Sequence, residues 1–299
     1  MRIVSLLPAA TDLVFELGLG DQLVGVTHAC VTPPEYRDLA IVTQLRQTDD
    51  RPAQSADAEF ESRSLSGTPE YELDVELIHE LQPELIITQP LNPLCASSPD
   101  DLRDLADELE SRPLVLPLDP RTLGEVIGEA RTIARLTDTM DAAVDLVKEC
   151  AQRVDRVRLA MRNARRPRVI ALESLDPPRV AGHWMPQLID YAGGEDVLGF
   201  AGEPAQELPW EMIIAAQPEL VIVMPCMFGA EIAHREAEMQ RDRLTRLANC
   251  QVVAVDAAAY FTRPGPKIVE GLELLAELIH PELMPGNPGF AGKAIAVRL

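Results

Sequence analysis

Cysteine and histidine residues follow two of the short apolar runs in this sequence. His28 and Cys30 come just after Leu23–Val26, and Cys226 follows Leu220–Met224. Thiolate and imidazole are ligands that suit zinc, copper and cobalt better than calcium or magnesium. A reduced cysteine is also a small apolar residue that is often simply buried. The pattern predicts a ligand or metal site, with the packing interpretation left open for each cysteine.

The loops that follow predicted strands are expected to lie together. In open α/β sheets, ligands bind beyond the carboxyl ends of the parallel strands. The candidates for ligand contact on these loops are His28, Cys30, Cys95, Glu173, His183, Trp184, Cys226 and Phe261. The candidate metal ligands among them are His28, Cys30, Cys95, His183 and Cys226. We expect His79, His234 and His280 to be solvated, because they lie in or beside helices next to charged residues.

The adjacent residues His183 and Trp184 are the most specific local indication of a ligand site in the sequence. Trp184 offers a broad apolar face for stacking on a flat ligand, and His183 can donate, accept or coordinate. An equally weighted interpretation has Trp184 filling the core of its lobe beside a histidine bonded to the backbone. Phe261 is expected to form a wall of the ligand cleft, whereas the role of Tyr260 is left open.

Apolar runs without alternation are separated by amphipathic stretches, which indicates an α/β fold with mainly parallel, buried strands. The predicted strands are Arg2–Leu6, Leu23–Val26, Leu85–Thr88, Leu114–Leu118, Arg168–Leu172, Leu220–Met224 and Gln251–Val255. The predicted helices are Ala10–Leu17, Asp74–Leu81, Pro99–Glu110, Gly124–Leu136, Pro186–Tyr191, Trp210–Ala215, Glu231–Leu247 and Pro266–Ile279.

Segments of the first half recur in the same order in the second half. The stretch from Asp74 that ends in Gln-Pro-Glu-Leu-Ile-Ile is echoed from Pro209 by one that ends in Gln-Pro-Glu-Leu-Val-Ile. Two copies of one Rossmann-like α/β unit explain this most simply. Between them, Asp138–Ala164 has helical apolar spacing and neither glycine nor proline, which predicts a stiff rod of roughly 40 Å. The predicted organisation is an N-terminal lobe at 1–137, a bridging helix at 138–165 and a C-terminal lobe at 166–299.

Composition excludes several classes of partner. The formal net charge of −21 repels phosphate backbones, so we expect no nucleic-acid partner. We also expect no membrane insertion, because no window approaches the ~20 apolar residues that a bilayer requires. The amino terminus lacks the features of an export signal. The chain is therefore expected to be cytoplasmic, or periplasmic or extracellular if an export segment was removed. The acidic stretch Gln44–Glu72 is expected to be an exposed excursion.

Motifs for common catalytic chemistries are missing from the sequence. It contains no G-x-G-x-x-G turn after the first strand, no phosphate-binding P-loop, no G-x-S-x-G elbow and no H-E-x-x-H helix. A cysteine–histidine pair drawn from Cys30 or Cys226 with His28 or His183 lacks an orienting third group. We therefore expect a binding protein and not an enzyme.

The chain resembles the class III periplasmic binding proteins for iron-siderophores and cobalamin, which are substrate-binding components of ABC importers. The resemblance runs from Arg2 to about Pro285 and is carried by R-I-V-S-L-x-P-A-A-T-D, L-G-L-G-D-Q-L-V-G-V-T-H-A-C and L-D-V-E-L-I-x-x-L-Q-P-E-L-I-I. Within that family the chain is similar to the subgroup labelled cobalamin-binding protein. The segments that carry this similarity are T-H-A-C, C-A-S-S-P, D-P-P-R-V-A-G-H-W-M-P, M-P-C-M-F and F-T-R-P-G-P.

The resemblance implies a two-lobed fold in which a long helix joins the lobes and the ligand is held in the cleft between them. It implies a corrinoid such as cobalamin, or another metal-bearing macrocycle, as the ligand, an ABC permease as the partner, and no chemical turnover. The alternative left open is a cytosolic metalloprotein or metalloenzyme. Such a protein would bind a transition metal such as zinc through the Cys and His side chains of the same cleft.

Overall fold

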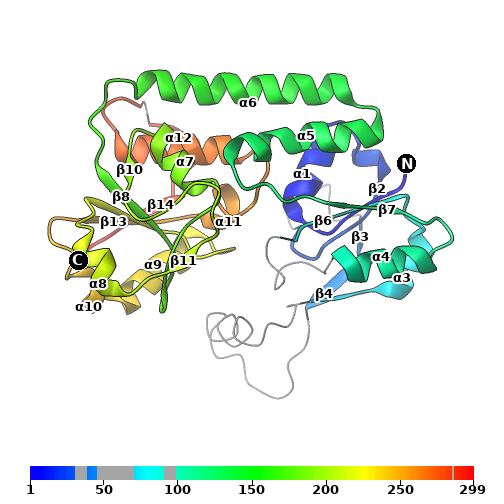
Figure 1. Ribbon diagram of the computed structural model, residues 1–299, viewed down its shortest axis with the longest axis horizontal. Helices are drawn as coiled ribbons and strands as arrows, with labels where there is room; N and C mark the ends of the chain where they lie inside the picture. Colours follow the sequence, from blue (N-terminus) through cyan, green and yellow to red (C-terminus); the bar gives the residue numbers. More distant parts are fainter. Residues whose placement is uncertain (31–38, 46–70, 91–98, 285) are drawn as a thin grey trace, which may run out of the picture. The chain divides into compact units, whose positions relative to one another are not determined.

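The computed structural model describes residues 1–30, 39–45, 71–90, 99–284 and 286–299 (Figure 1). The chain forms two compact units, Met1–Asp119 with Glu129–Val144, and Pro120–Gly128 with Asp145–Leu299. The division falls inside the helices α5 (Leu123–Thr137) and α6 (Met140–Ala160). The lobe boundaries expected from the sequence, including the bridging segment 138–165, stay a prediction.

The first unit is built on a five-stranded parallel sheet with the order β3-β2-β1-β6-β7 (Figure 1). Helices α3 (Val75–Leu81) and α4 (Pro99–Glu108) pack on one face through Ile78 and Leu102. Helix α1 (Pro8–Glu16) covers the other face. The strands are β1 (Ile3–Ser5), β2 (Leu23–Val26), β3 (Ala40–Ile41), β6 (Leu85–Thr88) and β7 (Leu114–Pro117).

The second unit has a mixed sheet with the order β11-β9-β8-β12-β13-β14, and β10 also pairs with β8. Its centre is parallel, as predicted, but β9, β11 and β14 are antiparallel to their neighbours, which the sequence analysis missed. The strands are β8 (Arg168–Leu175), β9 (Pro178–Val180), β10 (Glu195–Asp196), β11 (Gln206–Glu207), β12 (Leu220–Val223), β13 (Gln251–Val255) and β14 (Ala294–Val297).

Two groups of helices cover the two faces of this mixed sheet (Figure 1). One face carries α8 (Trp210–Ala215), α9 (Ala230–Met239) and α10 (Arg241–Leu244), whose apolar side chains share one core cluster with β8, β12 and β13. The other face carries α7 (Met185–Tyr191) and α12 (Ile268–Ile279). A short helix, α11 (Ala257–Tyr260), follows β13.

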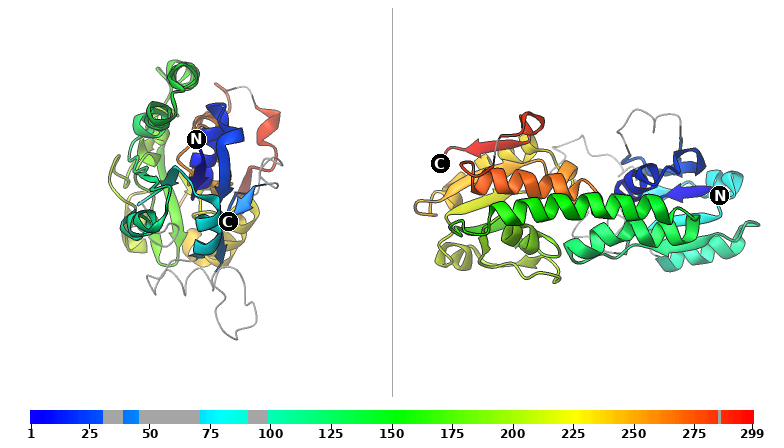
Figure 2. Two further views of the ribbon diagram at one scale, coloured as in Figure 1. Left: turned by 90° about the vertical axis from the view of Figure 1, so that its right-hand side faces the viewer. Right: turned by 90° about the horizontal axis from the view of Figure 1, so that it is seen from above.

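A bidentate ion pair joins α6 to α12 within the second unit. Arg153 donates from Nε and Nη2 to the two carboxylate oxygens of Glu273, at 3.0 and 2.7 Å. The side chains are 27% and 18% exposed, and the views in Figure 2 show the two helices running alongside each other. Removing either side chain of this ion pair would be destabilising, because the other charge would remain partly buried without a partner.

The internal repeat extends to the backbone. The echoed segments form the corresponding pairs α3–β6 and α8–β12. Gln82 and Gln217 occupy the same place in the two copies, and both have left-handed backbones, with φ of 43° and 47°. Each precedes a proline, which disfavours the right-handed helical conformation in the residue before it. Gln82 is the C-cap of α3, and Gln217 follows Ala216, the C-cap of α8, so neither helix continues past its glutamine.

Some predicted elements differ in detail from the structure. The expected helix Glu231–Leu247 is two helices, α9 and α10, which meet at Gln240. The ends of the expected acidic excursion pair as antiparallel strands, β4 (Thr43–Leu45) and β5 (Tyr71–Leu73), while residues 46–70 lie outside the described residues. None of the helices that the structure describes is long and apolar enough to cross a lipid bilayer.

Candidate functional site

Buried hydroxyl groups gather where β1 of the first unit ends. Thr11 Oγ1 lies 2.8 Å from Ser5 Oγ and 3.2 Å from Cys30 Sγ. Ser5 and Thr11 are fully buried, and Cys30 is 9% exposed. Helix α1 begins directly after β1, which brings Thr11 back over the end of the strand. Cys30 is thus buried beside the hydroxyl group of Thr11.

Thr43 orients the imidazole of His28. The backbone N–H of His28 donates to Thr43 Oγ1 at 2.9 Å, and Nδ1 lies 2.7 Å from the same oxygen. Burial lowers the pKa of His28, which favours the neutral ring. When Nδ1 carries the ring proton and donates it to Thr43, Nε2 has the lone pair that a metal needs. Thr43 could not be predicted from the sequence, because it begins β4 and meets His28 only through a contact between segments separate in the chain.

Glu173 lies at an irregularity between β8 and β9 of the second unit. The register shifts there, from Leu172 opposite Val180 to Ser174 opposite Arg179. Burial raises the pKa of the Glu173 carboxyl to about 7, and the positive charge of Arg179 opposes part of that rise. Near neutral pH the carboxyl group can therefore donate or accept a hydrogen bond.

The segment that contains His183 is fixed to the loop between β10 and β11. His183 has a left-handed backbone, with φ of 51°, and its N–H donates to Glu203 O at 2.6 Å. In return, Gly202 N–H donates to His183 O at 2.8 Å. A side chain at Gly182 would collide with the backbone of Glu203. These contacts set the direction of the His183 side chain, which is half-buried.

Trp184 and Phe261 are core residues of the second unit in this structure. Trp184 is 6% exposed, and its indole Nε1 donates to Phe261 O at 2.8 Å. Phe261 is 1% exposed and packs against α12, where a side chain at Gly271 would come within 2.9 Å of its ring. Phe261 was predicted to form a wall of the ligand cleft, but it is buried in the core of the second unit. For Trp184 the core interpretation fits and leaves little of the stacking face accessible.

The loops after β12 and β13 are tied to each other. Met227 has a left-handed backbone, with φ of 68°, and its N–H donates to Thr262 Oγ1 at 3.2 Å. Ala258 N–H donates to Phe228 O at 3.0 Å. Cys226, Met227 and Phe228 remain half-buried. Cys226 follows the end of β12, as predicted from the sequence.

The cysteines that the structure describes differ in burial, which predicts different reactivity. Cys30 and Cys150 are buried, Cys226 and Cys250 are partly buried, and none of these four is in a disulfide. Burial raises the pKa of the Cys250 thiol to about 12, against a smaller opposing effect of a hydrogen bond to Val221. We expect iodoacetamide to modify Cys226 first of the four, and Cys250 at least about 100-fold more slowly, because the thiolate is the nucleophile.

Peptide mass spectrometry of the time course measures each cysteine separately. Urea-unfolded protein is the control, in which the four thiols should react at similar rates. Equal rates for Cys226 and Cys250 in the native protein would contradict the burial that the structure gives.

The expected metal ligands do not form a cluster in the described residues. His28 and Cys30 belong to the first unit, and His183 and Cys226 belong to the second. Within the described ranges, no three His, Cys, Asp or Glu side chains gather in a group that could hold a metal ion. Cys95 lies outside the described residues. The directly bound zinc of the alternative function therefore has no support from the described part of the chain.

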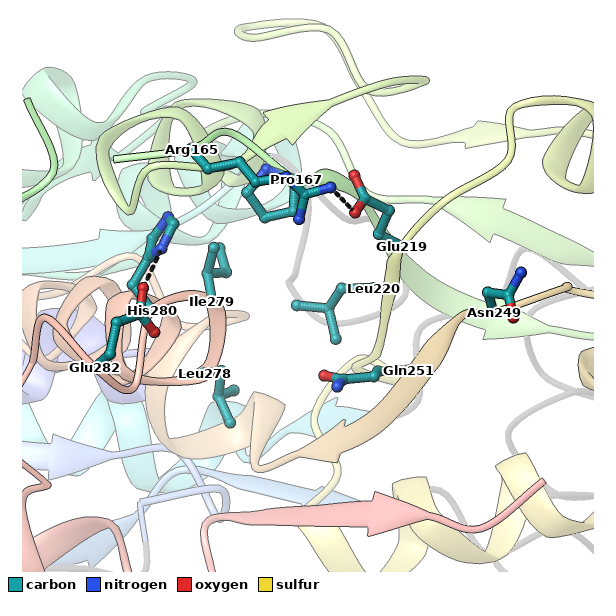
Figure 3. A pocket seen from close by; sticks show the side chains of 10 residues that line it. All are labelled: Arg165, Pro167, Glu219, Leu220, Asn249, Gln251, Leu278, Ile279, His280 and Glu282. Carbon is teal, nitrogen blue, oxygen red and sulfur yellow. Dashed lines mark hydrogen bonds and ion pairs between the residues drawn. The ribbon is translucent and has the colours of Figure 1, made fainter. Parts of the chain in front are cut away.

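A pocket of about 350 Å³ lies beside the amino-terminal ends of β12 and β13 in the second unit (Figure 3). The candidate ligand residues of this unit were predicted at the carboxyl ends of the strands. Its lining includes His280, which is 4% exposed, with Nε2 at 3.1 Å from Gly193 O and Nδ1 at 3.3 Å from Glu282. The expectation that His280 is solvated was wrong, because its ring packs where Gly193 has no side chain. None of the candidate ligand residues lines this pocket.

Sequence comparisons relate most of the chain to one family. The model of the family described as periplasmic binding protein matches residues 3–250. The vitamin B12-binding protein of Vibrio cholerae is 24% identical over 277 residues, which cover 91% of this chain and 86% of that protein. A substrate-binding lipoprotein of an ABC transporter from Bacillus subtilis is 21% identical over 296 residues, which cover 94% of this chain and 80% of that protein.

Solved structures share the fold. A periplasmic heme-binding protein from Pseudomonas aeruginosa superposes with a TM-score of 0.73 at 18% identity, over 100% of this chain and 98% of that one. The periplasmic vitamin B12-binding protein of Vibrio cholerae superposes with a TM-score of 0.65 at 22% identity, over 94% of this chain and 96% of that one. At these identities the likeness establishes the two-lobed α/β fold and leaves the ligand undecided.

Proposed function

Because this chain belongs to the periplasmic binding protein family, we propose that it delivers a corrinoid such as cobalamin to an ABC permease, without catalysing a reaction. The observation that carries the proposal is an alignment, 24% identical and covering 91% of this chain, with a protein named for binding vitamin B12. The family supports a substrate-binding role. In this proposal, side chains such as His28 and Cys226, which follow β2 and β12, contact the ligand. Haem is the second candidate, favoured by the structural similarity to heme-binding proteins.

We also propose that the chain works outside the cytoplasmic membrane. The matched family is described as periplasmic, and the relative from Bacillus subtilis is a lipoprotein. These relatives give no support to the cytoplasmic location expected from the sequence. A permease that releases the ligand from the loaded protein is the partner implied by such a role.

Visible absorption during titration separates the candidate ligands. We expect aquocobalamin to saturate the purified protein at one equivalent with a shift of its visible bands. If haemin saturates the protein and aquocobalamin does not bind, the proposed ligand is a porphyrin and not a corrinoid. Stoichiometric zinc by elemental analysis, with neither macrocycle bound, would overturn the proposal in favour of the metalloprotein.

Within this proposal, His28 contacts the metal of the ligand. Burial favours the neutral form of its ring by lowering the pKa, Thr43 Oγ1 lies 2.7 Å from Nδ1, and the imidazole can replace the axial water of aquocobalamin. We expect His28→Ala to weaken aquocobalamin binding at least about tenfold, equivalent to 1.4 kcal/mol, and to abolish the band shift. The matched control is His234→Ala on α9, where the imidazole lies 3.9 Å from Glu238. An unchanged band shift in His28→Ala would exclude coordination by this ring.

A further inference from the structure

An arginine without a charged partner follows β13 in the second unit. The side chain of Arg263 is half-buried, and its Nε is buried without a hydrogen-bond acceptor. Among the described residues, no carboxylate forms an ion pair with its guanidinium. Arg153, another half-buried arginine of the same unit, makes two hydrogen bonds to Glu273. Arg263, unlike Arg153, therefore has no carboxylate among the described residues to balance its positive charge.

The backbone around Arg263 is fixed by its neighbours. Thr262, the preceding residue, accepts the hydrogen bond from Met227 that ties the two strand-end loops together. Pro264 and Gly265 are buried, and Gly265 N–H donates to Arg263 O at 2.9 Å. The backbone of Arg263 therefore lies in the loop region that follows the carboxyl end of β13, and this is the end of a sheet where ligands of open α/β folds bind.

Electrostatics favours an external anion at this position. Partial burial costs a charged group its hydration, and a protein normally repays that cost with a carboxylate. Acidic side chains are abundant in this chain, which carries a net charge of −21, yet none pairs with Arg263 within the described ranges. Arginine's planar fork matches the oxygens of a phosphate or carboxylate group, with two hydrogen bonds in parallel.

We propose that Arg263 binds an anionic oxygen group of the ligand. The inference rests on the proposed function for the identity of that ligand. In cobalamin the group is the phosphodiester of the nucleotide tail, and in haem it is a propionate carboxylate. Because Nε is buried, the amino groups of the guanidinium are the ones that would bind the anion.

Cobalamin and cobinamide provide a matched pair of ligands, because cobinamide has the corrin ring but lacks the phosphodiester and its nucleotide. We expect Arg263→Gln to weaken cobalamin binding about tenfold or more, as for a lost charge-assisted hydrogen bond, and to change cobinamide binding less than about twofold. Arg263→Lys should fall between, because it keeps the charge without the planar fork. The control is Arg243→Gln, which removes the same charge from an ion pair with Asp176 on the surface of the unit.

Equal loss of affinity for cobalamin and cobinamide, or no loss for either, would overturn the inference while leaving the proposed function intact. If the protein instead binds haem, the same comparison is made between haemin and its dimethyl ester, which lacks the charged carboxylates. Haemin affinity should fall in Arg263→Gln and ester affinity should not.

A measurement with inorganic phosphate tests Arg263 without a macrocycle. The Nε–H resonance of Arg263 can be assigned by its loss in Arg263→Gln. We expect it to shift and saturate as phosphate is added to the full chain at constant ionic strength. If neither macrocycle binds, the proposed function fails and this titration alone decides the inference. An unmoved resonance would then overturn the inference.

Discussion

Replacing Trp184 with alanine is expected to lower the free energy of unfolding by about 3–5 kcal/mol, the range for removing a large aromatic side chain from a core. Trp184 is 6% exposed, and its indole N–H is the donor to Phe261 O. The substitution leaves both a cavity and a buried carbonyl without that donor. Urea unfolding followed by far-UV circular dichroism measures the change.

Two further variants show which part of Trp184 matters. Trp184→Phe keeps most of the ring volume but loses the N–H, so we expect a smaller loss of about 1–3 kcal/mol. Phe200→Ala is the control for an exposed aromatic residue, since Phe200 is 60% exposed in the same unit. It should change stability by no more than about 0.5 kcal/mol. If Trp184→Ala unfolds like the parent chain but binds cobalamin or haem more weakly, Trp184 is a stacking residue and the core interpretation is wrong.

Replacing Glu173 with glutamine is expected to stabilise the protein above neutral pH. The pKa of Glu173 is about 7 in the folded state, above the ordinary glutamate value of 4.5. The folded protein therefore binds this proton more tightly than the unfolded chain does. As pH rises from 4.5 towards 7, the parent chain loses stability, by at most about 3 kcal/mol. Glu173→Gln should lack that loss, because the amide does not titrate.

Unfolding midpoints in urea, measured from pH 5 to pH 8, test this sign directly. The difference between Glu173→Gln and the parent chain should be small at pH 5 and largest at pH 8. Glu207→Gln, at an exposed position of β11, is the control and should follow the pH profile of the parent chain. A variant that is less stable than the parent at pH 8 would show that the folded state favours the charged carboxylate.

Much of the fold could be predicted, because buried parallel strands leave a strong signal in sequence. The predicted ends of β2, β6 and β13 agree with the structure residue for residue. These strands are apolar runs that polar or turn residues bound on both sides. The strands β9, β11 and β14 were missed because each has only two to four residues, too few for a hydrophobic period to be recognised.

The candidate site was harder to predict, because burial of a loop side chain depends on what packs against it. Phe261 is buried because Gly271 on α12 leaves room for its ring. His280 has charged neighbours in sequence, but its ring packs onto the backbone of Gly193. The sequence placed Cys226 and His28 at strand ends, whereas Thr43 and Arg263 needed three-dimensional contacts to become visible. Whether the predicted ligand residues act together stays a prediction.

The matching glutamines at the ends of α3 and α8 also bear on ancestry. A left-handed residue before a proline also follows α4, where Arg112 precedes Pro113 with φ of 43°, so this backbone alone does not indicate common descent. Gln82 and Gln217 share in addition the sequence Gln-Pro-Glu-Leu, which leads each of them into a parallel strand. We take the shared sequence, backbone and strand together as the mark of a gene duplication.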